Sequence, residues 1–320
     1  MCGGAEPADM DSLNRMSLEL ADEALEFTEE LDVGAFELDN GTTVIDFGVE
    51  HVGGLEAGLL LTELQTAGLA TVQTRVDEVA GATFPHVELA CDQPGVALLG
   101  AQKAGWEVST DDYEGLGSGP ARALVAQEGE YRALDYVDAF EFAVLALESD
   151  ALPTAAAAEQ VADLADVNTE SVYLAAYRTA SVAGSVTAAA RAAELAVFRL
   201  YELGYDPMDV LTVSGSAPVA PVAADEEAAI GRTNDALAYG GRVHLTVAED
   251  FDEFGAVPSS AAERYGVPFA DIFADADWNA DDVDEGVFGP AQVTVDVIGG
   301  PTYTLGDVHE DLLADGFGIA

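Results

Sequence analysis

Apolar and polar positions alternate along the chain in patterns that predict short strands and amphipathic helices. Residues 11–31 repeat apolar side chains at helical spacing, with carboxylates on the opposite face, which is typical of a helix that covers a core. Residues 36–49 alternate on both sides of Asn40-Gly41, a dipeptide that strongly favours a tight hairpin turn. Residues 55–68 follow two glycines and carry only two charges, Glu56 and Glu63, so we expect a further helix there.

The length of 320 residues suggests two domains or one large domain. Residues 138–167 contain an apolar strand, a break with Ser, Asp and Pro, and an alanine-rich helix, so we place the boundary near Asp150. The prediction is an N-terminal α/β domain of residues 1–150 and a second α/β domain of residues 151–320. As an alternative, the C-terminal strands return to the first domain.

Residues 171–201 differ from the rest of the chain in their charge. The sequence has 60 acids in 320 residues, which corresponds to about six in 31 positions, yet this segment contains only Glu194 beside three arginines. Ser181 or Ser185 is suited to an N-cap and Gly204 to a C-cap. Apolar residues occupy all sides between these caps, so we expect a buried helix.

Arg191 and Glu194 lie on one face of this expected helix. Their spacing predicts an ion pair, because an unpaired charge inside a protein is too costly to keep. Such a pair is either a structural salt bridge in the core or a reactive group that faces a cleft. The spacing alone leaves both interpretations open.

The net charge of −49 is extreme for a chain whose apolar content is 49%. A single lysine, Lys103, accompanies ten arginines. The apolar content excludes an acidic disordered chain, and a folded surface saturated with carboxylates indicates adaptation to molar salt, where screening weakens self-repulsion. The charge also argues against a nucleic-acid partner. Each remaining arginine becomes a candidate for a specific role, whether in a site or in structural pairing.

The two cysteines, Cys2 and Cys91, are too few for a disulfide framework, which fits a reducing compartment. The first ten residues lack the basic and apolar regions of a signal peptide, and no apolar run approaches the length of a membrane span. We therefore expect a cytoplasmic protein with no membrane partner.

Residues 104–124 contain a glycine-rich loop followed by a possible helix start at Pro120. Free backbone N–H groups at Gly117, Ser118 and Gly119, with Arg122 within reach, suit an anion such as a phosphate. The loop lacks the Gly-Lys-Ser/Thr of a P-loop. A plain tight turn is the alternative.

Three other polar residues are weaker candidates for ligand binding. Asn234 and Arg242 belong to a polar stretch, although Asn and Asp often bond their own backbone in turns. Glu56 begins the helix at residues 55–68, where it either caps the first turn or faces a ligand.

Several kinds of chemistry have no signature in the sequence. The four histidines are scattered without zinc-ligand spacing, and no nucleophile elbow or dinucleotide-binding glycine motif is present. Residues 275–286 begin like a calcium-binding EF-hand loop, but Ala280 stands where glycine is required and Gly286 where glutamate is required. We expect no metal.

Taken together, these segments resemble the archaeal methenyltetrahydromethanopterin cyclohydrolase family from about Asn40 to Val295. Residues 112–116 depart from the family pattern. The resemblance rests on five runs in unbroken order: NGTTVIDFGVEHVGGLEAG, AGWEVSTDDYEGLGSGPARAL, TASVAGSVTAAARAAELAVFRLYELG, SAPVAPVAADEEAAIGRTNDALAYGGRV and VPSSAAERYGVPFADIF.

The resemblance implies an α/β (α+β) fold of two domains with mixed sheets and covering helices, and a ligand cleft between the domains. It implies a cytoplasmic homotrimer that needs no metal and no redox cofactor. The reaction it implies is reversible hydrolysis of 5,10-methenyltetrahydromethanopterin to the 5-formyl derivative, in the one-carbon metabolism of a halophilic archaeon. The family's catalytic Arg and Glu match Arg191 and Glu194.

The residue-based and family-based interpretations agree on this pair. Glu194 is assigned as the general base that activates water, and Arg191 as the residue that tunes and orients it. Gly117, Ser118, Gly119 and Arg122 are assigned to an anionic group of the pterin side chain. That list is completed by Asn234, Arg242 and Glu56 as further substrate-binding candidates.

Two other functions compete with this one. A reduced-pterin-binding or scaffold protein of the same fold would bind the ligand without chemistry. An unrelated phosphate-binding enzyme would use the GSGPAR loop and would not bring that loop close to Arg191.

Overall fold

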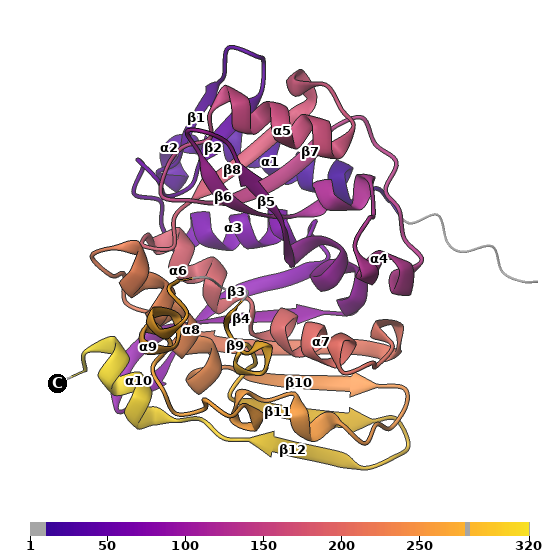
Figure 1. Cartoon of the computed structure of the whole chain (residues 1–320), viewed down its shortest axis with the longest axis vertical. Helices are drawn as coiled ribbons and strands as arrows, with labels where there is room; N and C mark the ends of the chain where they lie inside the picture. Colours follow the sequence, from indigo (N-terminus) through magenta and orange to yellow (C-terminus); the bar gives the residue numbers. More distant parts are fainter. Residues whose placement is uncertain (1–10, 279–281, 320) are drawn as a thin grey trace, which may run out of the picture.

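The computed structural model describes residues 11–278 and 282–319. Two residues considered above, Cys2 and Ala280, lie outside this part. The described chain forms two six-stranded sheets with helices packed on and between them, which confirms the α/β class (Figure 1). Within these ranges, no helix has both the length and the apolar character that crossing a membrane requires.

The first sheet has the strand order β1-β2-β8-β7-β6-β5. Its central strands β2, β8 and β7 are parallel, and the outer pairs are antiparallel. The predicted hairpin at Asn40-Gly41 is confirmed, because β1 and β2 pair across it. The strands are β1 (Gly34–Glu37), β2 (Thr43–Asp46), β5 (Ala104–Ser109), β6 (Glu114–Ser118), β7 (Ala143–Glu148) and β8 (Val172–Tyr177).

Helices cover both faces of this sheet. Leu145 lies in the apolar cluster that α5 (Ala155–Ala165) covers, whereas Val144 lies in the cluster covered by α1 (Leu13–Glu26) and α3 (Leu55–Gln65). Successive residues of a strand point to opposite faces, so β7 is buried on both sides and its sequence is apolar up to its last residue, Glu148.

The second sheet has the strand order β12-β11-β10-β9-β4-β3. Only β10 and β11 are parallel. Its strands are β3 (Ala70–Val79), β4 (Ala82–Cys91), β9 (Val210–Pro218), β10 (Arg242–Val247), β11 (Gln292–Val297) and β12 (Thr302–Gly306). The two sheets do not divide at residue 150. Strands β3 and β4 precede this residue but belong to the second sheet, and β8 follows it but belongs to the first. The domain boundary at Asp150 therefore stays a prediction.

The acid-poor segment forms two helices rather than the single helix expected between its caps. The side chain of Ser181 accepts the N–H of Gly184 at 2.9 Å and begins α6 (Val182–Ala189). The N–H of Arg191 bonds the carbonyl of Ala188 at 3.0 Å, a three-residue bond that ends this helix. Arg191 then precedes α7 (Ala192–Glu202) as its N-cap residue. Neither glycine nor proline marks the break in the sequence.

A glycine in the second sheet sets the position of α7. A Cβ on Gly215 of β9 would lie 3.0 Å from the backbone nitrogen of Ala193 and 2.9 Å from its Cβ. Only glycine therefore permits the first turn of α7 to lie this close to the strand. That first turn carries Glu194.

The remaining elements surround these two sheets. They are α2 (Thr28–Leu31), α4 (Gly129–Leu134), α8 (Glu226–Gly240), α9 (Phe269–Asp275), α10 (Glu310–Phe317), a π-helix (Gly95–Gln102), and short 3-10 helices at Pro120–Leu124, Thr169–Ser171, Pro207–Asp209, Phe254–Ala256, Ser259–Ala261 and Glu285–Val287.

Candidate active site

A cavity of about 500 Å³ lies where the first sheet meets α6, α7 and α8. Leu116, Glu148 and Tyr177 of the first sheet form one part of its wall. Glu148 and Tyr177 end the parallel strands β7 and β8, and the carboxyl ends of parallel strands are where α/β proteins usually bind ligands. The polar side chains of the wall are Lys103, Glu148, Tyr177, Thr187, Arg191, Glu194, Glu202, Thr233, Asn234 and Glu285.

The Arg191–Glu194 pair lies in this wall. Nη1 of Arg191 is 3.1 Å from Oε2 of Glu194, which is the ion pair that the spacing predicts. Glu194 is 3% exposed, yet it borders the cavity. A sequestered carboxylate beside a guanidinium, with open space in front of it, can accept a proton from a bound water molecule.

Besides Glu194, Arg191 interacts with Tyr177 and Glu148, which end strands β8 and β7 of the first sheet. Burial by itself lowers the pKa of Arg191, but Tyr177, Glu194 and Glu148 outweigh it, so the pKa lies above its usual value and the guanidinium stays charged. Burial, followed by the charge of Glu148, raises the pKa of Tyr177, which keeps its hydroxyl protonated. Arg191 is therefore a fixed cation between two carboxylates.

Behind the wall, a hydrogen-bonded chain of neutral side chains links the first sheet to α6. The hydroxyl of Thr187 donates to Oε1 of Gln65 at 2.7 Å, and Nε2 of Gln65 donates to the hydroxyl of Ser118 at 2.8 Å. Gln65 and Ser118 are both buried. A buried amide with both ends paired fixes the orientation of its neighbours, so this chain holds Thr187 at the cavity.

Lys103 is a cavity residue that the sequence interpretation missed. Its Nζ is 3.1 Å from a carboxylate oxygen of Glu130 and 4.8 Å from the centre of the Phe198 ring. Both Lys103 and Phe198 line the cavity. The signal was present, because a chain of 320 residues with one lysine marks that lysine as unusual.

Two carboxyl groups approach each other at another part of the wall. Burial, and then the neighbouring Glu285, raise the pKa of Glu202, although Nη1 of Arg199 lies 3.3 Å away. Like charges in partly buried positions do not both ionise freely. This part of the wall consequently favours a bound proton or a cationic group.

The glycine loop does not line the cavity. Gly117 and Ser118 belong to β6 and pair with β7, and the N–H of Gly119 donates to the carbonyl of Ala101 at 2.9 Å. The N–H groups expected to be free for an anion are thus committed to the sheet and its connection. Ser118 reaches the site only through Gln65.

Arg122 is fully buried and paired within the protein. It forms an ion pair with Glu128, its guanidinium donates to the carbonyl of Lys103, and it lies 5.6 Å from the ring centre of Tyr131. Burial lowers its pKa, but Tyr131 and Glu128 raise it above the usual value. Arg122 is therefore paired within the protein and does not line the cavity.

The other three candidates lie in different places. Asn234 lines the cavity, with its amide donating to the carbonyl of Ile230 at 2.9 Å. Arg242 lies on the outward surface of the second sheet, beside a separate hollow. Glu56 borders another surface hollow together with Glu23 and Glu63. Of the candidates for substrate binding, the structure joins only Asn234 to the Arg191–Glu194 pair.

The fold and the cavity define a class of protein, and comparison with known families identifies it. A buried carboxylate–guanidinium pair facing a cavity is suited to hydrolysis of a small ligand. The family model described as Cyclohydrolase (MCH) matches residues 12–317. The chain is accordingly a cyclohydrolase, a class of hydrolases.

Individual relatives narrow this class. The chain is 78% identical over 311 residues to the methenyltetrahydromethanopterin cyclohydrolase of Halobacterium salinarum, covering 97% of this chain and 100% of the relative. It is 38% identical to the enzymes of the same name from Methanospirillum hungatei and Methanothermobacter marburgensis, covering 97% of this chain and 99% and 100% of theirs. The chain belongs to the methenyltetrahydromethanopterin cyclohydrolase family, which confirms the resemblance.

Proposed function

We propose that this enzyme adds water to the methenyl carbon of 5,10-methenyltetrahydromethanopterin and opens the ring reversibly to the 5-formyl derivative. Oxygen from water becomes the formyl oxygen. One proton of that water passes to the nitrogen released when the carbon–nitrogen bond breaks, and the other leaves to solvent. The substrate carbon already carries positive character, so the enzyme must mainly position water and move these protons.

Glu194 is the general base in this proposal. Its carboxylate borders the cavity and accepts a proton from water as the oxygen attacks the methenyl carbon. Arg191 contacts the carboxylate at 3.1 Å and orients it before the cationic substrate arrives. When the tetrahedral adduct collapses, the proton on Glu194 is available for the nitrogen that departs.

Two other wall residues bind the substrate. Lys103, at the cavity surface beside Phe198, takes over the anion-binding role first assigned to the glycine loop and Arg122. Asn234 offers an amide to polar groups of the pterin. The change follows from burial, because the guanidinium of Arg122 is fully buried, is paired with Glu128 and does not line the cavity.

The proposal also covers where the substrate binds and the conditions in which the enzyme works. The cavity has walls from the first sheet and from helices that pack on the second, which supports the expected pterin cleft between two domains. The proposed enzyme works in the cytoplasm of a halophile as a homotrimer, in one-carbon metabolism, and without a metal or redox cofactor. The low cysteine content and high negative charge support this environment.

The observation that carries the proposal is the position of Glu194 at the cavity wall, within a chain of this family. A direct test follows the absorbance of the methenyl chromophore in molar salt, with methanopterin and folate forms as separate substrates. Loss of the chromophore with the methanopterin form supports the proposal. Tight binding of that form without loss of absorbance would instead show the non-catalytic pterin-binding protein.

A further inference from the structure

The second sheet presents one of its faces to solvent. Along β10, Val243 and Leu245 are buried on the side where α7 packs, whereas Arg242 and His244 are exposed on the opposite side. A hollow of about 440 Å³ lies in this exposed side and spans β3, β4, β9, β10 and β11. It is separate from the cavity that contains Glu194.

Two register rows cross this side of the sheet, and we call them together the outer face. The first row runs through Gln73, Glu88, Ser216, Arg242 and Gln292, each the partner of the next.

The second row of the outer face lies two residues along each strand. It runs through Thr71, Ala90, Ser214, His244 and Thr294. All ten side chains border the hollow.

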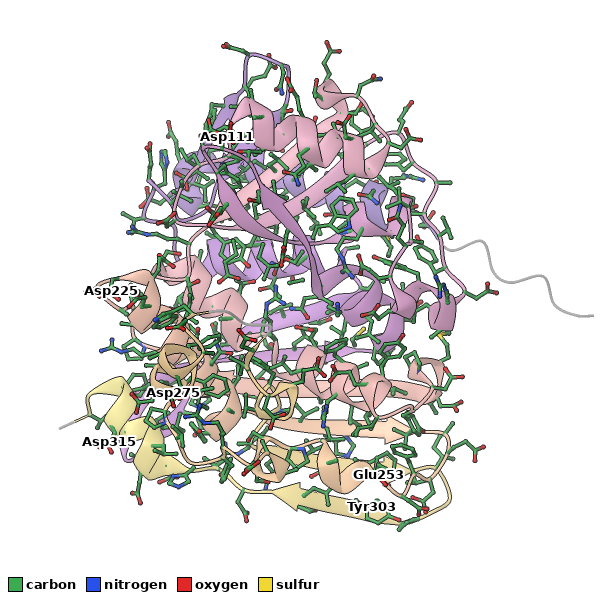
Figure 2. The ribbon with its side chains drawn as sticks, viewed as in Figure 1. Asp111, Asp225, Glu253, Asp275, Tyr303 and Asp315 are labelled. Carbon is green, nitrogen blue, oxygen red and sulfur yellow. The ribbon has the colours of Figure 1, made fainter. Side chains whose placement is uncertain are left out.

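The charge of the outer face is unlike that of the rest of the protein. Among its ten side chains only Glu88 is acidic and only Arg242 is an arginine, whereas the whole chain has 60 acids against 11 lysines and arginines. By contrast, six of the seven exposed positions in residues 19–30 are Asp or Glu. Asp111 and Asp315, both labelled in Figure 2, are further examples of exposed acids.

A face kept for solvent would carry the carboxylates that this chain places elsewhere. Antiparallel sheets can expose one polar side to water, but that alone does not explain why acids are missing from this one. A second protein surface does explain it, because charged residues are depleted where a surface is buried by a partner.

The positions of Glu88 and Arg242 indicate which protein binds the outer face. Ser216 separates Glu88 from Arg242, so the two lie on either side of one strand, about 10 Å apart at the usual strand spacing. Glu88 is held by Arg75 at 2.5 Å, whereas Arg242 has no ion pair among the described residues. When copies meet by symmetry, the half with Arg242 can face the half with Glu88 of another copy.

The size of the outer face can be compared with that of a standard interface. Five strands about 4.8 Å apart, each carrying two rows of side chains about 7 Å apart, cover an area of roughly 250 Å². A standard interface buries about 800 Å² on each partner, so the outer face supplies about a third of that area and flanking residues supply the rest.

We propose that the outer face is the surface through which copies of this chain assemble, with Arg242 of one copy facing Glu88 of another. This assigns a surface to the assembly in the proposed function, and it does not depend on the reaction. It also gives Arg242, which is remote from the cavity, a role that is not substrate binding.

The test is the mass of the protein in molar potassium chloride, measured by sedimentation across a range of concentrations. Ser214→Glu adds a charge at the centre of the outer face, and Arg242→Glu removes the complementary charge. Each is expected to raise the dissociation concentration at least tenfold. Ala156→Glu, on the exposed side of α5, is the matched control and should assemble as the original chain does.

A second measurement uses the original chain and so avoids any effect of mutation on folding. Diethylpyrocarbonate should modify His51, whose side chain is 47% exposed, but should spare His244 in the assembled protein. A monomeric original chain, unchanged assembly of Ser214→Glu, or equal modification of both histidines would overturn the proposal. An assembled chain that fails to hydrolyse the methenyl substrate would overturn the proposed reaction and leave this surface standing.

Discussion

The hydroxyl of Tyr177 lies 3.4 Å from Oε2 of Glu148, and the two residues are register partners at the ends of the parallel strands β8 and β7. Tyr177 is also a hydrogen-bond partner of Arg191. The proposed catalytic pair, Arg191 and Glu194, is thus held at one side by the ends of the central parallel strands of the first sheet. A small shift of a positioned group can reduce the rate of a reaction even when the ligand still binds.

Tyr177→Phe should lower kcat about tenfold and change KM little, because it removes the contact that orients Arg191 while the ring remains buried. Steady-state kinetics by the absorbance assay would show this. Tyr205→Phe is the control, since it removes another buried hydroxyl, bonded to the carbonyl of Glu249, outside the cavity. Equal losses of kcat in both variants would contradict a positioning role for Tyr177.

Lys103→Met should raise KM about tenfold, because it removes the cation that we assign to an anionic group of the substrate and keeps a similar apolar stem against Phe198. The effect on kcat should be small. Titration of substrate against the variant measures the change. Unaltered substrate affinity would remove Lys103 from binding.

Arg122→Met should instead destabilise the fold by about 3–5 kcal/mol, because it leaves Glu128 without its buried partner. The fraction that remains folded should bind substrate normally. Chemical unfolding in molar salt gives the stability, and kinetics on the folded fraction give KM. A raised KM with unchanged stability would return Arg122 and the glycine loop to the binding site.

Asp235 on α8 predicts a pH dependence of stability. Burial raises its pKa from 3.8 to about 6, although the N–H of Phe269 donates to it at 2.8 Å. Between these values the folded protein keeps a proton that the unfolded chain has released. The stability that this carboxyl contributes therefore falls as pH rises through that range.

Asp235→Asn keeps the acceptor for Phe269 and cannot ionise. Its free energy of unfolding, minus that of the original chain, should grow by roughly 2.4 kcal/mol from pH 4 to pH 7. The subtraction cancels most of the other carboxylates, which titrate in both proteins. A difference that stays constant with pH would show that Asp235 does not carry the shift.

The sequence predicted the parts of the site that depend on local spacing. Arg191 and Glu194 are three residues apart, so any helical turn through them brings the side chains together. Their unusual charge in an acid-poor segment marked them. The hairpin at Asn40-Gly41 was equally local, since its turn residues determine it.

Contacts that depend on the folded chain were not visible in the sequence. The spacing of Arg122 and Glu128, six residues apart, did not indicate the ion pair that they form. Glu148 and Tyr177 lie in apolar strands that resemble simple core segments, and only the parallel pairing of β7 with β8 brings their polar ends to the cavity. The break between α6 and α7 at Arg191 could not be predicted, because no glycine or proline occurs there.

The central claim is that Glu194 removes the proton from the attacking water, and Glu194→Gln tests it most directly. The amide keeps the size of the side chain and can still accept from Arg191, so the fold and KM should persist while kcat falls by about 10² or more. Glu202→Gln, the same change at the far end of α7, should retain most of its turnover. Near-normal loss of the methenyl chromophore by Glu194→Gln would contradict the account.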